Sequence, residues 1–453
     1  MRKIIKTFVC LLLLLGLLSV PSLAKSKKNW VVSWGTAPTE INYDFSEDFG
    51  ISAFGANLTF RIRLVNNLDG EQVRLRFSNL FGKSPIQICK CAIALSGEDG
   101  SSIIKGSSVV ASFGGKQSAS IPAGGSLTTD PIDFSVKAGQ SVSVSFYTPY
   151  FLELDTGSII GAETYVSVGP NVTATNQVAL PLFTNHLANE EIQVIPLLCG
   201  MDVMSDGYAI VITGDSTLTN TAFTIFNDVL RRAGINNKSV LCTAVSGNRL
   251  LTEWEDMDVG SIFGDRFLKR MDRDLIQLPG VKYALIRVGG NDINHAALVS
   301  RQGITPKPTA KQLTDGLAKV EKACKAKGIT PIFLPYTGYA AYERTKDGKR
   351  DCFWSMDTQV LVDAINKWSN ARNKANGVPK IDLSSLDDPA RKYFLNPAYT
   401  TDGAHLNWLG QQKFVDLIPL SAVGINVKKR PIANLSPRYS LWDKVGLFLQ
   451  GES

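Results

Sequence analysis

The chain has 453 residues, of which 44% are hydrophobic and 20% are charged. That length exceeds one typical hydrophobic core, so two domains are expected, and the composition excludes an intrinsically disordered chain. The formal net charge of +7 is small and scattered, without the concentrated basic face that nucleic-acid binding requires.

Residues 1–24 have the pattern of a secretory signal. Three basic residues precede an apolar run from Phe8 to Val20, which ends in Ser22-Leu23-Ala24 with small residues at the cleavage-defining positions. The run of about 13 apolar residues is shorter than the ~20 that span a bilayer, and no later segment reaches that length. We expect cleavage near Ala24, export of the mature chain to the cell envelope or medium, and no stable membrane insertion.

Residues 25–205 are expected to form an all-β accessory domain with a connecting segment. Alternating runs separated by turn residues predict strands at Leu58–Leu64, Gln72–Phe77, Ile86–Leu95, Ser107–Phe113, Ile132–Val136 and Ser141–Tyr147. Regular spacing without helical periodicity is typical of a β-sandwich or jelly roll. Residues 152–205 are mixed and are expected to pass between domains. Because no Trp occurs between positions 35 and 253 to offer a sugar-stacking face, we interpret the domain as one packed against its neighbour.

Six cysteines remain beyond the export signal, too few for a disulfide scaffold in a chain of this length. Cys89 and Cys91 are two apart in a predicted strand, so both side chains point to one face. Their Cβ atoms would be roughly 6–7 Å apart, against the ~4 Å of a disulfide. No His or second Cys pair accompanies them, so we interpret both as small core residues.

Residues 206–425 alternate strands with helices, which predicts a parallel sheet with helices on both faces. The predicted strands are Tyr208–Thr213, Ser239–Val245, Tyr283–Val288, Ile329–Leu334 and Pro379–Leu383. The predicted helices begin near Thr219 and then cover Phe263–Ile276, Lys311–Lys327, Asp357–Asn376 and Asn407–Ile418. The remaining tail, 426–453, is basic and punctuated by proline, and receives no function.

Four short motifs occur in order in this region: Gly214-Asp215-Ser216, Ser246-Gly247-Asn248, Gly289-Gly290-Asn291-Asp292 and Asp402-Gly403-Ala404-His405. Each fragment alone is weak, since such sequences are common in turns and Ser often caps a helix. Together they follow predicted strands or open helices, at the strand ends where open α/β sheets place their sites.

The motifs supply the groups of a serine esterase. Ser216 provides a hydroxyl, which attacks only when a base takes its proton. His405 is one of three histidines in the chain, and Asp402 three residues earlier can orient it through Nδ1. The N–H groups of Ser216 and Gly247 and the amide of Asn291 can stabilise an oxyanion.

On these residues the chain resembles the SGNH hydrolases, also called GDSL esterases, over roughly residues 206–420. The resemblance implies a three-layer α/β/α fold and metal-free ester hydrolysis, with Ser216 as nucleophile, His405 as base, Asp402 as the residue that orients it, and an oxyanion hole of Ser216, Gly247 and Asn291. Thr217 departs from the Leu or Ile of many members. The motif Ser33-Trp34-Gly35-Thr36-Ala37-Pro38 ahead of a β-domain is similar to a secreted bacterial branch.

The expected function is hydrolysis of short acyl esters, acetyl above all, on a small molecule or a polysaccharide, without a cofactor or metal. One alternative is a lipase or lysophospholipase of the same fold, although no long apolar lid segment is evident. Another is an inactive carbohydrate-binding or adhesion protein, although such proteins usually lose the nucleophile or the base. His295, four residues after Asn291, is expected either to line the acyl or leaving-group side of the pocket or to be a loop or helix-start residue without a chemical role.

Overall fold

The computed structural model describes residues 28–41, 44–46, 49–50, 54–159, 161–176, 184–187, 190–219, 221–254, 263–346 and 349–435. The expected export signal at 1–24 lies outside these residues, as does the expected tail after position 435. Across the described ranges, no helix combines the length and the apolar character that crossing a bilayer requires.

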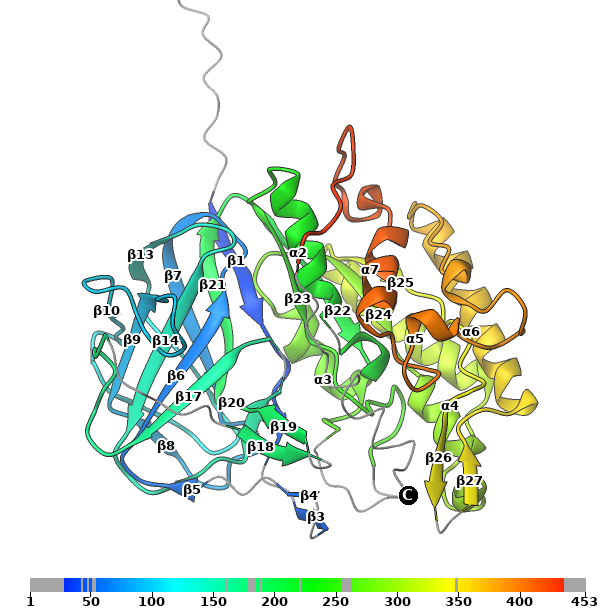
Figure 1. The fold of residues 1–453 in the computed structure, drawn as a ribbon, viewed down its shortest axis with the longest axis horizontal. Coiled ribbons are helices and arrows are strands. Elements are labelled where there is room, and N and C mark those ends of the chain that lie inside the picture. Colours follow the sequence, from blue (N-terminus) through cyan, green and yellow to red (C-terminus); the bar gives the residue numbers. More distant parts are fainter. Residues whose placement is uncertain are drawn as a thin grey trace, which may run out of the picture.

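The first half of the described chain is built on two antiparallel five-stranded sheets (Figure 1). One has the order β1 (Asn29–Gly35), β21 (Leu198–Ser205), β7 (Gly70–Ser78) and β12 (Ser126–Thr128), with β13 (Ile132–Val136) also paired to β7. The other has the order β10 (Val109–Val110), β9 (Lys90–Leu95), β14 (Ser141–Thr148), β6 (Leu58–Val65) and β17 (Glu163–Val168). Phe77 of β7 meets Phe146 of β14 with ring centroids 5.5 Å apart, so the two sheets enclose one core.

The other strands of this half are short, with two to four residues each. They form the groups β8 (Ile86–Ile88) with β11 (Ala119–Ile121), β5 (Phe54–Gly55) with β15 (Leu152–Glu153), β2 (Thr39–Glu40) with β16 (Thr156–Ser158) and β20 (Ile195–Pro196), and β3 (Asp44–Ser46), β4 (Phe49–Gly50), β18 (Thr184–Leu187) and β19 (Glu190–Gln193).

Four expectations for this region need correction. The strand predicted at Ile86–Leu95 is broken at Cys89, because β8 pairs with β11 whereas β9 pairs with β14. Cys91 is therefore fully buried but Cys89 only half-buried, so the expectation of two core cysteines holds for one of them. The strand predicted at Ser107–Phe113 is reduced to Val109–Val110. The segment 152–205 is not simply a connection, because its last strand, β21, lies between β1 and β7.

The second half contains a parallel four-stranded sheet in the order β23 (Lys238–Cys242), β22 (Tyr208–Gly214), β24 (Val281–Arg287) and β25 (Thr330–Phe333). Alternate strand residues belong to two different cores. Ile210 and Ile212 pack with α2 (Ala222–Arg232) and α7 (Trp408–Leu417). Val211 and Ile286 pack with α3 (Phe267–Met271), α5 (Ala310–Ala326) and α6 (Met356–Ala375). Helices therefore cover both faces of the sheet, which explains the almost continuous apolar runs of its strands.

The helix ends follow local rules. Thr309 and Gln312 form a capping box at the start of α5, and Ser355 and Thr358 form another at α6. The remaining elements are α4 (Gly290–Ala297), the hairpin β26 (Glu343–Lys346) and β27 (Lys349–Cys352), a π-helical turn η2 (Asp272–Ile276), and the 3-10 turns η1 (Ser216–Leu218), η3 (Val299–Arg301), η4 (Ser384–Leu386), η5 (Pro397–Tyr399) and η6 (Leu420–Val423).

Two expectations for the second half are also wrong. The helix predicted over Phe263–Ile276 begins only at Phe267, because Arg266 has extended dihedral angles, and it continues as the π-helical turn η2. The strand predicted at Pro379–Leu383 is absent from the described residues. There Asp382 accepts hydrogen bonds from the N–H and hydroxyl of Ser384, which favours a turn over a strand.

The two halves meet along β1. Val32 donates its N–H to Pro279 O at 3.0 Å and accepts the Ser239 hydroxyl on its carbonyl at 2.6 Å. Val31 and Val32 also belong to the same buried cluster as Val211 of β22. The β-rich half is thus packed against the helical half. Residues at the carboxyl ends of β22 and β24 border a small cavity.

Candidate active site

The first motif forms a tight turn at the end of β22. Gly214 has φ +141°, and a Cβ there would lie 1.7 Å from Arg287 O, so glycine is required where β22 passes β24. Asp215 then caps η1, since its Oδ1 accepts the Thr217 N–H at 3.1 Å and the Thr217 hydroxyl at 2.7 Å. Ser216, 9% exposed, is the first residue of η1, and this backbone fixes where its hydroxyl lies.

His405 joins the last motif to the first. Its Nε2 lies 2.9 Å from Ser216 Oγ, and its Nδ1 lies 2.5 Å from Asp402 Oδ2. A carboxylate only accepts hydrogen bonds, so Nδ1 carries the proton and Nε2 accepts from the Ser216 hydroxyl. The three side chains therefore form a continuous chain of hydrogen bonds that ends at the hydroxyl.

Asp402 is held by its own turn as well as by the imidazole. Its Oδ1 accepts the backbone N–H groups of Ala404 at 2.9 Å and His405 at 2.8 Å. Gly403, directly after Asp402, has φ +87°, and a Cβ there would meet Ala341, so glycine allows the chain to turn back. Burial tends to raise the pKa of Asp402, but its charge interaction and hydrogen bonds with His405, and the two N–H donors, outweigh burial and lower that pKa. Asp402 is therefore a carboxylate.

Asn291 and Gly247 take different positions around Ser216. Asn291 lies in the first turn of α4 and borders the same small cavity as Ser216 and His405. Its Nδ2 donates to Asn248 O at 3.1 Å, which fixes the plane of the amide. Gly247 lies in the turn after β23 with φ +71°, and a Cβ there would be 2.4 Å from the ring of Phe263. Gly247 itself is not among the residues that border the cavity.

The cavity has a volume of about 30 Å³. Ser216, Asn291 and His405 form part of its wall, together with the larger side chains Tyr339, Tyr342 and Val362. A cavity of this size holds about one or two waters, so it suits a group of very few heavy atoms.

Tyr336 is a site residue that the sequence reasoning missed. Its hydroxyl donates to Asp215 Oδ2 at 2.9 Å and accepts the Gly290 N–H at 2.8 Å, so it links the Ser216 turn to the start of α4. Burial and the Asp215 charge raise the pKa of Tyr336 well above its usual value, which keeps the hydroxyl protonated. Tyr336 lies 121 positions from Asp215 and is not part of a sequence motif, so the sequence alone could not identify it as a site residue.

Two further residues resolve points left open by the sequence. His295 lies on α4 with its Nδ1 3.0 Å from Asn291 O, and its ring meets Trp254 and Phe353 edge-on, outside the wall of the cavity. His295 thus lies in the last turn of α4, not at a helix start, and it does not line the cavity. Thr217 borders the cavity, and its hydroxyl donates to Asp215 Oδ1 at 2.7 Å, at the position where many SGNH hydrolases carry Leu or Ile.

Within the described ranges, no three His, Cys, Asp or Glu side chains are grouped closely enough to hold a metal ion. The six cysteines described there are free thiols.

Comparison with known proteins gives structural likenesses but no match to a protein-family model or to a curated protein. About half of the chain is similar to solved structures of a GDSL-like lipase and of acetyl xylan esterases. A GDSL-like lipase from Bacteroides thetaiotaomicron is 19% identical over 48% of this chain and 87% of its own, with a TM-score of 0.34. An acetylxylan esterase from Geobacillus stearothermophilus is 13% identical over 49% of this chain and 95% of its own, with a TM-score of 0.36.

A further acetyl xylan esterase is 18% identical over 48% of this chain and 100% of its own, with a TM-score of 0.34. The chemistry proposed below rests on the contacts around Ser216.

Proposed function

We propose that this protein is a serine ester hydrolase in which Ser216 is the nucleophile, His405 the general base and Asp402 the residue that orients and stabilises the imidazole. The observation that supports this most strongly is the two-sided bonding of His405, to Ser216 Oγ at 2.9 Å and to Asp402 Oδ2 at 2.5 Å. A serine that merely capped a turn would not need a histidine at its hydroxyl or a carboxylate behind that histidine.

The proposed reaction has two halves. His405 Nε2 takes the hydroxyl proton as Ser216 Oγ bonds to the ester carbonyl carbon, and it then gives that proton to the departing alkoxide. The acyl group remains on Ser216. Water attacks the acyl-enzyme next, losing a proton to Nε2, and the carboxylic acid leaves as the proton returns to Oγ.

The oxyanion formed in each half is proposed to lie against the N–H groups of Ser216 and Gly247 and the amide of Asn291. The amide Nδ2 of Asn291 carries two hydrogens, of which one is directed to Asn248 O. The second is the one proposed to meet the developing charge. Donors fixed before the reaction in this way stabilise the transition state without reorganising during it.

We further propose that the acyl group is short, acetyl above all. The cavity of about 30 Å³ beside Ser216 supports this, because each additional methylene would need space that Tyr339, Tyr342 and Val362 fill. The alcohol is proposed to be a polysaccharide hydroxyl met outside the cell, in keeping with the export pattern of residues 1–24.

The test is hydrolysis of p-nitrophenyl acetate, butyrate and octanoate by the wild type and by Ser216→Ala, alongside acetate release from acetylated xylan, mannan, pectin and peptidoglycan. We expect kcat/KM to fall along the acyl series and Ser216→Ala to be inactive with an unchanged circular dichroism spectrum. A long acyl groove would give the opposite trend, since each buried methylene contributes ~0.8 kcal/mol.

The outcomes separate the alternatives. Preference for octanoate, with no acetate released from any polymer, would replace the short-chain proposal by a lipase. A folded wild type without Ser216-dependent hydrolysis would favour an inactive binding protein.

A further inference from the structure

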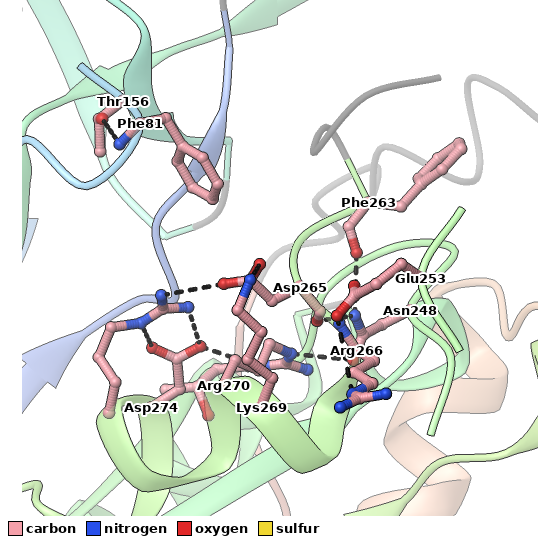
Figure 2. Close-up of polar contacts among 12 residues, drawn as sticks. Phe81, Thr156, Asn248, Glu253, Phe263, Asp265, Arg266, Lys269, Arg270 and Asp274 are labelled. Atoms are coloured by element: carbon pink, nitrogen blue, oxygen red, sulfur yellow. Dashed lines mark hydrogen bonds and ion pairs between the residues drawn. The ribbon is translucent and has the colours of Figure 1, made fainter. Parts of the chain in front are cut away.

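Arg270 is a fully buried cation that the reaction scheme above does not use. It lies on α3 and is 1% exposed. Asp274, one turn later, compensates its charge with Oδ2 at 3.2 Å from Nη1 (Figure 2). A buried guanidinium with one carboxylate still has several N–H groups to satisfy, and their partners indicate what this residue does.

Those partners all belong to the segments that carry the candidate oxyanion donors. Nη2 donates to Gly214 O at 2.8 Å, two residues before Ser216. Nη1 donates to Thr243 O at 2.8 Å, directly after β23. Nε donates to Asn248 Oδ1 at 2.9 Å, next to Gly247. One planar side chain therefore spans the ends of two neighbouring strands and the turn that follows one of them.

Asn248 extends this network to the third donor. Its backbone carbonyl accepts the Asn291 amide at 3.1 Å, so Arg270 and Asn291 are linked through a single residue. Its side-chain Nδ2 donates to Phe263 O at 2.9 Å and to Asp265 O at 2.8 Å, as Figure 2 shows. These bonds hold Phe263 where its ring packs on the α-carbon of Gly247.

We propose that Arg270 is a positioning residue of the oxyanion hole, which sets the spacing between the Ser216 turn, the Gly247 turn and the Asn291 amide. The inference rests on the proposed function. Arg270 itself does not border the cavity, and it acts through the three backbone segments that it joins. A displacement of about 1 Å in such donors is enough to slow a reaction roughly 10²-fold.

The first test is Arg270→Lys. Lysine keeps the charge beside Asp274, but a single ammonium cannot make the three separate bonds of the guanidinium. We expect kcat for p-nitrophenyl acetate to fall roughly 10–100-fold with KM nearly unchanged, because the donors act on the transition state.

The matched control is Arg273→Lys. Arg273 bonds the same Asp274 at 2.5 and 2.8 Å, and we expect its replacement to leave kcat within about twofold because these bonds do not reach the three segments.

The second test asks whether the loss passes through the oxyanion hole. In an Asn291→Ala background, Arg270→Lys should lower kcat by clearly less than it does in the wild type, because one of the three donors that Arg270 positions is already missing. If the fold-losses in kcat of the two single variants multiply fully in the double variant, the proposal is overturned, and Arg270 acts on the stability of the fold rather than on the oxyanion donors. Asn248→Ala, which removes the acceptor of Nε and keeps the Gly214 and Thr243 contacts, repeats both measurements if Arg270→Lys does not fold.

The proposed function and the positioning role of Arg270 are contradicted by different results. If the Ser216→Ala variant hydrolyses the ester as fast as the wild type, the proposed function itself is contradicted. A wild type with Ser216-dependent activity, together with folded Arg270→Lys and Asn248→Ala variants of normal kcat, contradicts only the positioning role.

Discussion

His405 determines what the site can do, because each ring nitrogen has a different partner. The carboxylate of Asp402 holds the proton on Nδ1, which leaves the lone pair of Nε2 directed at a hydroxyl 189 positions away in the sequence. The motifs predicted these three residues because each carries a characteristic neighbour, such as Gly403 or Asp215. Tyr336 and Arg270 have no such neighbours, and only the fold reveals their contacts.

Asn291→Ala should lower kcat by ~10²–10³, equivalent to about 3–4 kcal/mol, with a smaller change in KM. The amide is proposed to bind the oxyanion, which exists only after attack, so its loss leaves substrate binding largely intact. Steady-state kinetics with p-nitrophenyl acetate measures this split.

Asn291→Asp provides the comparison, since it keeps the size of the side chain but places a negative charge beside the oxyanion. It should be slower than Asn291→Ala. An effect confined to KM in both variants would show that Asn291 binds ground-state substrate instead.

At the scale of elements, the sequence predicted the strands and helices that bury a periodic apolar face. Lys311–Lys327 and Asp357–Asn376 are found within a residue or two as α5 and α6. The strands and helices that were predicted wrongly are those whose bounds depend on contacts with residues outside the local sequence pattern. Cys89 marks a change of pairing partner from β11 to β14, which no local pattern records. Asp382 closes a turn where apolar alternation alone predicts a strand.

The start of α4 yields a prediction about pH. Asp292 is 3% exposed, and its carboxylate accepts the N–H groups of Leu250 at 2.7 Å and Leu251 at 2.9 Å. Burial nevertheless raises the pKa of Asp292 to about 6. Since an unfolded Asp has a pKa of ~3.9, the folded state binds this proton more tightly. The stability that Asp292 contributes is therefore complete below about pH 4 and is lost as the pH rises through about 6.

The substitution Asp292→Asn should remove that loss, because an amide side chain does not titrate in this range. We expect the change in unfolding free energy between about pH 4 and pH 7 to differ between the variant and the wild type by about 2–3 kcal/mol. Urea unfolding at unit steps of pH measures the difference. Parallel pH profiles for the two proteins would contradict a raised pKa at this residue.

At the scale of the whole molecule, one buried cluster extends from the β-rich half onto one face of the parallel sheet, and a second cluster lies on the other face of that sheet. β1 is central to this arrangement, because it pairs with β21 on one side and bonds residues of the helical half through Val32. The sequence indicated a domain packed against its neighbour, but it could not identify β1 as the contact, since one apolar strand resembles another until its partners are known.

Val32→Ala should therefore destabilise both halves together. Val32 is fully buried, and removing its two methyl groups should cost about 2 kcal/mol. Differential scanning calorimetry should show one transition, shifted to lower temperature as a unit. Two transitions, of which only one moves, would mean that the halves fold independently.

The central claim is that Ser216 is a nucleophile activated by His405, and reaction with a fluorophosphonate probe tests it most directly. Peptide mass spectrometry of the labelled protein should find the phosphonate on Ser216 in the wild type. It should find none on Ser216→Ala, and strongly reduced labelling on His405→Ala, because the hydroxyl then has no base to take its proton. Equal labelling of the wild type and His405→Ala, or a folded wild type that leaves Ser216 unmodified, would contradict the account.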